Sequence, residues 1–409
     1  MILIPRRYQE EGISFLKSHK RAMLADAPGL GKTLQASMAA VKPVLIAAPT
    51  YLTEQWYDFI REQFPKDSVK IAQGTYHNKM VALAHRADWT IVNIEMLRSY
   101  TMPKVTTFII DESHHVRGRD SQQSLGALRV AVNADYIYLL TATPICNEPD
   151  DLYMQFQLIS PEDFPSYYKF IEQYCNVYST PWGNKVRGAK DPKRLFELMS
   201  KYGISRGYKD VGLELPPLIE NRIMVKPTNE FMKTYKKLKE SYNLDGMQMN
   251  SIAEAMQTLR RMTACKEKTD ALMGVVEDQT AKESAVVFCW YKSSAEHLGK
   301  LLKAPVITGD TAAKDRRIIA NKSHIVVATL ASLSEGVDLS SHKVCIFFEE
   351  DYTPGIMYQA LSRVRRYSAD NRPVRSYTIM VKGTVDETVH SAVTERISNV
   401  REILRRALV

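Results

Sequence analysis

The feature that most constrains the fold of this chain is a set of short, continuous apolar runs that occurs twice along it. Runs of this length that are apolar throughout indicate strands buried on both faces, which is typical of parallel sheets covered by helices. The first group lies at 22–26, 44–48, 90–92, 107–110 and 136–140, and the second at 284–289, 304–307, 324–328, 343–348 and 376–380. We therefore predict an α/β fold with two parallel sheets.

Strand signals almost vanish between the two groups. Lys, Glu, Met and Leu recur there at helical spacing, and the adjacent Pro216 and Pro217 favour an extended connector. We predict a first lobe over 1–151, helical protrusions over 152–270 with the lobe linker near 204–225, and a second lobe over 271–409. A capping box, Thr384 and Glu387, predicts the start of a packed C-terminal helix.

A phosphate-binding loop is the strongest local motif. The sequence DAPGLGKT, Asp26 to Thr33, follows a predicted strand and opens into a predicted helix. Glycines in such a loop let backbone N–H groups face phosphates, the lysine reaches the β and γ phosphates, and the hydroxyl can bind Mg²⁺. Asp26 stands where most such loops have glycine. We assign nucleotide contacts to Pro28, Gly29, Leu30, Gly31, Lys32 and Thr33.

Two acidic residues follow the apolar run at 107–110. Because ligands of parallel sheets sit at the carboxyl ends of the strands, Asp111 and Glu112 are expected in the same site. We predict that Asp111 holds Mg²⁺ and that Glu112 orients and polarises the attacking water. The alternative for this acidic pair is a solvated loop. The alternative for His114 and His115 is a surface pair or a stray metal site.

Further polar groups follow later apolar runs. Thr141 and Thr143 of the TATP sequence could hydrogen-bond the DESH segment and report nucleotide state. In the second half, Arg363 and Arg366 are spaced to share a helical face, where arginines can neutralise charge developing on a transferred phosphate. A solvated basic surface is the alternative for these two arginines.

The order of these motifs resembles superfamily 2 helicases and translocases, and most closely their Swi/Snf-type branch. The supporting segments are RRYQEEGISFL at 6–16, APTYLTEQW at 48–56, TATPICNEPDDLY at 141–153, ISRGYKDVGLELPP at 204–217, ATLASLSEGVDLS at 328–340 and QALSRVRR at 359–366. Within the branch, the segments at 170–175, 203–211 and 382–389 look most like the fork-remodelling, annealing-helicase group. The resemblance implies two RecA-like lobes that hydrolyse ATP with Mg²⁺.

The same resemblance assigns further site residues. It implies that Arg6, Gln9 and Gln359 help bind ATP, with Gln9 recognising adenine. It implies that hydrolysis is coupled to DNA through His114, Thr141, Thr143, Gly336 and Asp338. It places nucleic-acid contacts at Thr50, Gln55, Trp56, Thr308 and Thr329.

Composition fits this expectation without establishing it. Lys and Arg outnumber Asp and Glu by 55 to 46, which suits a polyanionic partner. We expect duplex or forked DNA, held by its backbone with low sequence specificity, and a monomer that protein partners recruit. Two alternatives remain: a strand-separating DNA or RNA helicase, and an ATPase subunit used as a nucleotide switch.

Cysteines and apolar runs indicate the compartment. Five widely spaced cysteines without a CxxC pair favour buried thiols in a reducing environment over a zinc or disulfide framework. No apolar run approaches the length of a membrane span. We therefore expect an intracellular protein without membrane attachment, in the cytoplasm or nucleoid, and the compactness of the chain suggests a viral or bacterial source.

Overall fold

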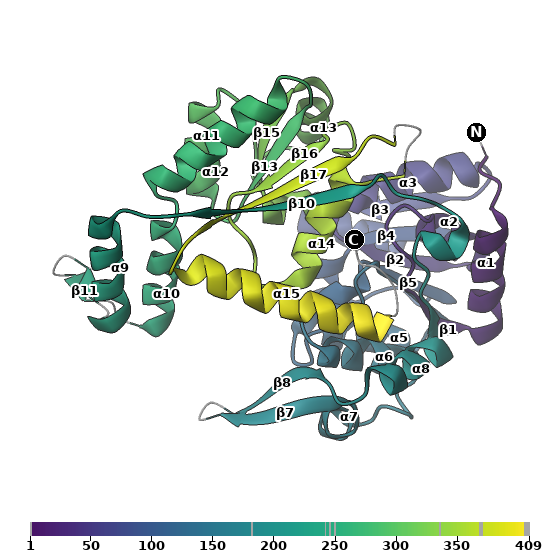
Figure 1. The fold of residues 1–409 in the computed structure, drawn as a ribbon. Helices are drawn as coiled ribbons and strands as arrows, with labels where there is room; N and C mark the ends of the chain where they lie inside the picture. The colour runs from purple at the N-terminus through teal and green to yellow at the C-terminus, as the bar shows by residue number, and fades with distance from the viewer. Residues whose placement is uncertain are drawn as a thin grey trace. The chain divides into compact units, whose positions relative to one another are not determined.

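The structure, a computed structural model, describes residues 2–404 apart from 181–182, 242, 245–246, 249–250, 335–336 and 368–370. The chain forms two compact units (Figure 1). Unit 1 contains Met1–Glu214 together with Arg396–Leu408, and unit 2 contains Leu215–Glu395.

Unit 1 is built on a seven-stranded parallel sheet in the order β3-β4-β2-β5-β6-β1-β9. The strands are β1 (Arg21–Leu24), β2 (Val44–Ala48), β3 (Val69–Ala72), β4 (Trp89–Asn93), β5 (Thr107–Asp111), β6 (Tyr136–Leu140) and β9 (Gly203–Ile204). Every residue of β2 and β5 is buried, as expected for central strands covered on both faces.

Helices and one hairpin complete unit 1. The α-helices are α1 (Arg7–His19), α2 (Lys32–Ala39), α3 (Thr50–Gln63), α4 (Tyr76–Ala84), α5 (Gln122–Ala131), α6 (Leu152–Ile159), α7 (Tyr167–Tyr174) and α8 (Pro192–Tyr202). Short 3₁₀ turns are η1 (Ile94–Arg98), η2 (Ser113–Val116), η3 (Pro149–Asp151) and η4 (Lys209–Val211). Strands β7 (Cys175–Thr180) and β8 (Gly183–Ala189) pair antiparallel as a separate hairpin.

Unit 2 carries a six-stranded parallel sheet in the order β10-β17-β16-β13-β15-β14. Its strands are β10 (Leu218–Val225), β13 (Ala285–Cys289), β14 (Val306–Ile307), β15 (Ile325–Thr329), β16 (Val344–Phe347) and β17 (Val374–Val381), and β11 (Asn243–Leu244) pairs with β12 (Met247–Gln248). Its helices are α9 (Asn229–Ser241), α10 (Ile252–Met262), α11 (Lys266–Thr280), α12 (Lys292–Leu301), α13 (Ala313–Lys322), α14 (Pro354–Val364), the turn η5 (Leu330–Ser334), and the start of α15 (Val385–Leu404). Among the described residues, no helix combines the length and apolarity that crossing a bilayer requires.

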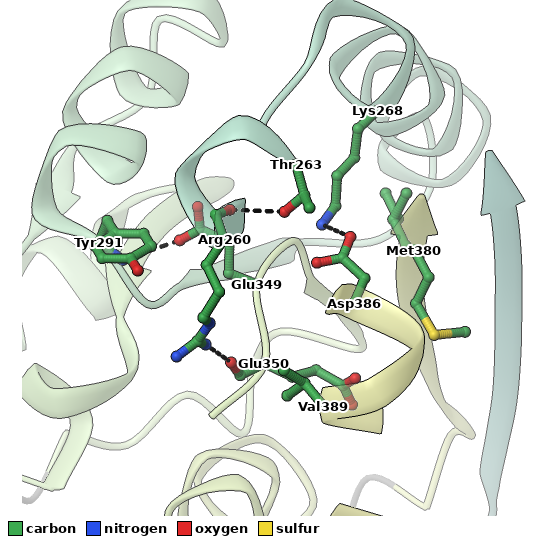
Figure 2. Close-up of a pocket in the computed structure, with 10 residues that line it drawn as sticks. Arg260, Thr263, Lys268, Tyr291, Glu349, Glu350, Met380, Asp386 and Val389 are labelled. Atoms are coloured by element: carbon green, nitrogen blue, oxygen red, sulfur yellow. Dashed lines mark hydrogen bonds and ion pairs between the residues drawn. The ribbon is translucent and has the colours of Figure 1, made fainter. Parts of the chain in front are cut away.

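A polar cluster joins helix α10 to the rest of unit 2 (Figure 2). The buried Lys268 donates to Asp386 at 2.7 Å, and the Arg260 guanidinium donates to the carbonyl of Glu350 at 2.6 Å. The Glu349 carboxylate accepts the backbone N–H groups that follow β13, at 2.8 and 2.9 Å. Each buried charge in this cluster therefore has a partner, which is the condition for burying it.

The predicted α/β fold with two parallel sheets is confirmed, while the middle of the chain corrects the prediction. The region 152–270 is not purely helical: it contains the β7–β8 hairpin, β9 in the sheet of unit 1 and β10 in the sheet of unit 2. Strand β8 is mostly exposed and has no apolar run, so its sequence gave no strand signal. The boundary at Leu215 falls inside the predicted linker at 204–225.

Candidate active site

Three neighbouring strands of unit 1 end at the same edge of its sheet. Strand β1 leads into the phosphate loop, β5 ends at Asp111, and β6 leads into the TATP sequence; β5, β6 and β1 are consecutive in the sheet. Because all three are parallel, their carboxyl ends bring these segments together. The sequence motifs therefore form one site.

Glycine backbones shape the phosphate loop. Gly29 and Gly31 both have φ near +76°, a conformation that favours glycine. A Cβ on Gly31 would also lie 2.3 Å from Gln9 Nε2, so a side chain there would displace the Gln9 amide. Helix α2 starts at the next residue, Lys32, and its N-terminal N–H groups and dipole face the place where phosphates bind in loops of this kind.

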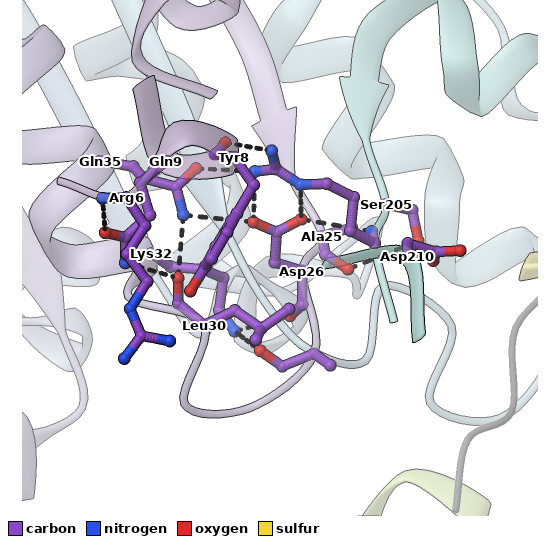
Figure 3. A network of polar contacts seen from close by, with 12 residues as sticks. Arg6, Tyr8, Gln9, Ala25, Asp26, Leu30, Lys32, Gln35, Ser205 and Asp210 are labelled. Atoms are coloured by element: carbon purple, nitrogen blue, oxygen red, sulfur yellow. Dashed lines mark hydrogen bonds and ion pairs between the residues drawn. The ribbon is translucent and has the colours of Figure 1, made fainter. Parts of the chain in front are cut away.

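Lys32 and Gln9 both contact the loop itself. Lys32 Nζ donates to the carbonyl of Asp26 at 2.7 Å, and Gln9 Nε2 donates to the carbonyl of Leu30 at 3.1 Å. The other end of the Gln9 amide accepts the backbone N–H of Arg6 at 2.8 Å (Figure 3). Gln9 thus fixes the start of α1 against the phosphate loop, and its contact with adenine stays a prediction.

Asp111 is buried at the end of β5. Its Oδ2 accepts the indole N–H of Trp56 at 2.8 Å, and its Oδ1 accepts the backbone N–H of Glu112 at 2.9 Å. Burial, and then the charge of Glu112, raise the pKa of Asp111 to about 6, while the bond from Trp56 and the positive charge of Lys32 oppose that rise.

The position of Trp56 differs from the prediction that it contacts nucleic acid. The resemblance assigned it a nucleic-acid contact, but it is 2% exposed and its indole N–H is held by Asp111. In this structure the side chain offers no surface to a nucleic acid. It supports the Asp111 carboxylate from inside the core.

Glu112, His114 and the TATP sequence form a connected polar group. His114 Nδ1 lies 3.3 Å from a Glu112 carboxylate oxygen and 3.2 Å from Thr141 Oγ1. Thr141 Oγ1 also accepts the backbone N–H of Thr143 at 3.0 Å. Glu112 itself has a left-handed backbone with φ +49°. The predicted link between the DESH and TATP segments is therefore present as hydrogen bonds.

A second bridge joins the same two segments. Ser113 Oγ donates to Gln155 Oε1 at 2.8 Å, and Gln155 Nε2 donates to the carbonyl of Pro144 at 2.7 Å. Gln155 is fully buried on α6. A rearrangement of either segment must then disturb the other, as a sensor of nucleotide state requires.

Thr33 and Asp111 suit a magnesium ion. A hydroxyl and a carboxylate are the oxygen donors that Mg²⁺ prefers, usually with water and substrate phosphates completing the shell. The raised pKa of Asp111 reflects a buried negative charge that a nearby cation would stabilise.

The predicted arginine pair of unit 2 is only partly as expected. Gln359 and Arg363 lie on α14, but this helix ends at Val364, and Arg366 lies beyond its C-terminal residue. The two arginines therefore do not share a helical face. Arg366 Nη1 instead lies 3.4 Å from Asp338 Oδ2. Gly336, the other coupling residue predicted nearby, lies outside the described residues.

The remaining predicted nucleic-acid residues differ in exposure. Thr50 is exposed and Gln55 half-buried on α3. Thr308 and Thr329, at the ends of β14 and β15, are 7% and 6% exposed. The hydroxyl of Thr308 accepts the backbone N–H of Asp310 at 3.3 Å and closes its own turn. Direct DNA contact by these two buried threonines is therefore not supported in this structure.

Arg206 was missed by the sequence analysis. Its guanidinium forms a bidentate ion pair with Asp26 at the start of the phosphate loop, at 2.9 and 2.6 Å. The signal was available: an aspartate in place of the usual glycine needs a cation if it is buried. Nothing in the sequence pattern showed which of the many basic residues would supply it.

Comparison with known proteins gives two family matches. The profile described as "SNF2-related domain" matches residues 8–274, and the one described as "Helicase conserved C-terminal domain" matches residues 267–368. Together they run through the phosphate loop, the DESH and TATP segments, and α14.

Similar curated proteins come from animals and bacteria. The chain is 26% identical to "SWI/SNF-related matrix-associated actin-dependent regulator of chromatin subfamily A-like protein 1" of Xenopus tropicalis, over 95% of this chain and 44% of that protein. It is 24% identical to human "DNA annealing helicase and endonuclease ZRANB3", over 93% and 38%, and 23% identical to "Uncharacterized ATP-dependent helicase MG018" of Mycoplasma genitalium, over 99% and 42%. The chain thus spans less than half the length of these relatives.

A solved structure is also similar. It is described as "Sulfolobus solfataricus SWI2/SNF2 ATPase core in complex with dsDNA", with a TM-score of 0.47 and 20% identity, covering 98% of this chain and 95% of the other.

Proposed function

Since the SNF2-related profile covers more than half of its residues, the chain belongs to that family, and we propose that it is a DNA-stimulated ATPase that moves along duplex or forked DNA. The observation that carries the proposal is the meeting of three motifs at one sheet edge: phosphate loop, Asp111–Glu112 and TATP. Forked DNA is favoured as substrate because one relative is named as a DNA annealing helicase.

Each residue has a chemical role in this proposal. Lys32 and the N-terminus of α2 bind the phosphates, and Thr33 and Asp111 hold Mg²⁺, which neutralises phosphate charge when bound. Glu112 holds the water that attacks the γ phosphorus as the bond to the β-phosphate oxygen breaks. Placing that water is the main contribution that a protein makes to this reaction.

The His114 contacts supply the coupling. His114 touches both Glu112 and Thr141, so a change in the TATP segment alters the environment of the residue that holds the water. We propose that DNA acts on hydrolysis through this path, with Gly336 and Asp338 as its counterparts in unit 2. Arg363 and Arg366 remain the candidates to neutralise charge on the transferred phosphate, with Gln359 beside them.

The test measures ATP hydrolysis by wild type, Glu112→Gln and the exposed control Glu54→Gln. Each is assayed without nucleic acid and with single-stranded, duplex and forked DNA and RNA, alongside displacement of a triplex-forming strand. The proposal predicts strong stimulation by duplex or forked DNA, triplex displacement, and loss of hydrolysis in Glu112→Gln alone.

The alternatives give different results in the same assays. Unwinding of fork or hybrid substrates, with stimulation only by RNA or single strands, would favour a strand-separating helicase. Stimulated hydrolysis without triplex displacement would favour a nucleotide switch. Fluorescent-nucleotide binding shows whether Glu112→Gln still binds ATP, as a variant that lacks only the water-holding carboxylate should.

A further inference from the structure

A fully buried carboxylate stands at the start of the phosphate loop. Asp26 is 0% exposed, and its oxygens accept Arg206 Nε at 2.9 Å, Arg206 Nη2 at 2.6 Å and Gln35 Nε2 at 3.2 Å. Figure 3 shows Asp26 and Gln35 turned toward each other in this network. An isolated buried charge would be very costly, so Asp26 depends on Arg206.

Arg206 also holds both helices that flank the loop. Its Nη2 donates to Gln35 Oε1 on α2 at 2.7 Å, and its Nη1 donates to the carbonyl of Tyr8 on α1. The guanidinium carbon lies 5.4 Å from the centre of the Tyr8 ring. The planar guanidinium of arginine carries several directed N–H groups, and these make the contacts possible. A lysine ammonium cannot reproduce this geometry.

The backbone around Arg206 is bonded to the loop as well. Ala25 N–H donates to the carbonyl of Ile204 at 2.7 Å, and Ala27 N–H donates to the carbonyl of Arg206 at 2.9 Å. Farther along, the Tyr208 hydroxyl donates to the carbonyl of Pro28 at 2.7 Å. Residues 25–28, at the start of the phosphate loop, are therefore hydrogen-bonded to the segment 204–208.

That segment lies just before the point at which the chain first enters unit 2. Residues 203–214 end the N-terminal part of unit 1, and unit 2 begins at Leu215. The segment contributes β9 to the sheet edge next to β1, then the turn η4. The phosphate loop and the connector to unit 2 thus share one buried ion pair.

We propose that Arg206 is a positioning residue that holds the phosphate loop in its nucleotide-binding shape and links ATP binding to the order of segment 204–212. Arg206 acts through Asp26. Because coupling between two sites is reciprocal, a nucleotide that favours the ordered loop must also stabilise the segment bonded to it. This inference rests on the proposed ATPase function but concerns binding, which can be measured without hydrolysis.

The experiment compares wild type, Arg206→Gln, Arg206→Lys, Asp26→Asn and the double variant Asp26→Asn with Arg206→Gln. Lys268→Gln serves as the control, because Lys268 forms a buried ion pair of similar length, 2.7 Å, with Asp386 in unit 2. Fluorescent ATP-analogue affinity, the KM and kcat of hydrolysis, melting temperature and backbone hydrogen exchange are measured for each.

In Arg206→Gln we expect the analogue affinity to fall and KM to rise by about tenfold, within the usual range of coupling between sites, while kcat changes less. Mg·ATP should slow amide exchange over 204–212 in wild type and not in this variant. Arg206→Lys should recover only part of the affinity. The double variant keeps no unpaired charge at this site and should lose little more affinity than either single variant. If Arg206→Gln does not fold, the double variant is measured in its place.

Three results would overturn the inference. The first is an unchanged analogue affinity in both Arg206→Gln and the double variant. The second is amide exchange over 204–212 that Mg·ATP does not change in wild type. The third is an equal loss of affinity in Lys268→Gln. A wild type that binds the analogue normally but hydrolyses no ATP would instead refute the proposed function and leave the positioning role standing.

Discussion

Replacing Trp56 with phenylalanine removes the indole N–H that donates to Asp111 Oδ2 over 2.8 Å. That bond favours the ionised carboxylate, so its loss should raise the pKa of Asp111 above its present value of about 6. A hydrogen bond to a charged group contributes about 1.5–3 kcal/mol, and one pKa unit corresponds to about 1.4 kcal/mol. The loss of the bond should therefore raise the proton affinity of the Asp111 carboxylate by at least about tenfold.

This shift predicts a pH-dependent weakening of Mg²⁺ binding. Below the pKa of Asp111 the carboxyl holds a proton that Mg²⁺ must displace, so affinity falls as the pH falls. The half-saturating Mg²⁺ concentration of the variant should therefore exceed that of wild type at pH 7, and should exceed it by a larger factor, about fivefold or more, at pH 6. At pH 9 the two proteins should agree.

The assay is the Mg²⁺ dependence of ATP hydrolysis at pH 6, 7 and 9, compared as ratios of variant to wild type. Trp89→Phe is a matched control, because Trp89 is also buried and its indole N–H also donates to a carboxylate, Asp67 Oδ2, at 2.8 Å. A ratio that does not change with pH, or the same ratios in Trp89→Phe, would refute the reasoning. A loss of DNA stimulation alone would restore the predicted nucleic-acid role of Trp56.

Three further outcomes are expected. Thr141→Val removes a hydroxyl that His114 and the Thr143 N–H both contact, so stimulation of hydrolysis by DNA should fall by several-fold while nucleotide affinity, measured by analogue binding, is retained. Gly126→Ala would place a Cβ 1.9 Å from the carbonyl of Leu97 and force α5 away from η1, so urea denaturation should show a loss of about 2 kcal/mol or more. Cys265 is the most accessible of the five thiols, and burial raises its pKa; the other four, Cys146, Cys175, Cys289 and Cys345, are buried. A thiol reagent at pH 8 should therefore modify one cysteine slowly in the native protein and all five in denaturant. Rapid labelling of several cysteines in the native protein would contradict the structure.

The parallel sheets could be predicted because their central strands carry a strong signal. Runs such as 44–48 and 107–110 are apolar throughout, and every residue of the corresponding strands β2 and β5 is buried. Strand β3, by contrast, alternates Val69 and Ile71 with Lys70 and lies at the sheet edge, so it has no continuous apolar run. The β7–β8 hairpin was missed for a related reason, since β8 is mostly exposed and needs no apolar face.

The site divides along similar lines. Lys32, Asp111 and His114 lie at the same sheet edge, as predicted, because a few consecutive positions fix each of them just beyond a strand end, while their roles stay predictions. The role of Trp56 could not be predicted, because it depends on whether α3 turns that side chain toward β5 or outward. Arg206 was missed because its partner lies 180 positions away in the chain. Arg366 was misplaced because a helix end at Val364 is not legible in the surrounding basic run.

The left-handed backbone of Glu112 lowers the stability of the fold at the position for which we propose a catalytic role. A residue with a Cβ at φ +49° costs about 1–2 kcal/mol relative to an ordinary conformation. Glycine would remove that cost, but it would lower the free energy of unfolding by about 0.4–1 kcal/mol because the unfolded chain gains conformational freedom. Glu112→Gly should therefore be inactive yet no less stable than wild type in urea. With the water-holding role proposed for Glu112, the glutamate at this position gives up stability for activity.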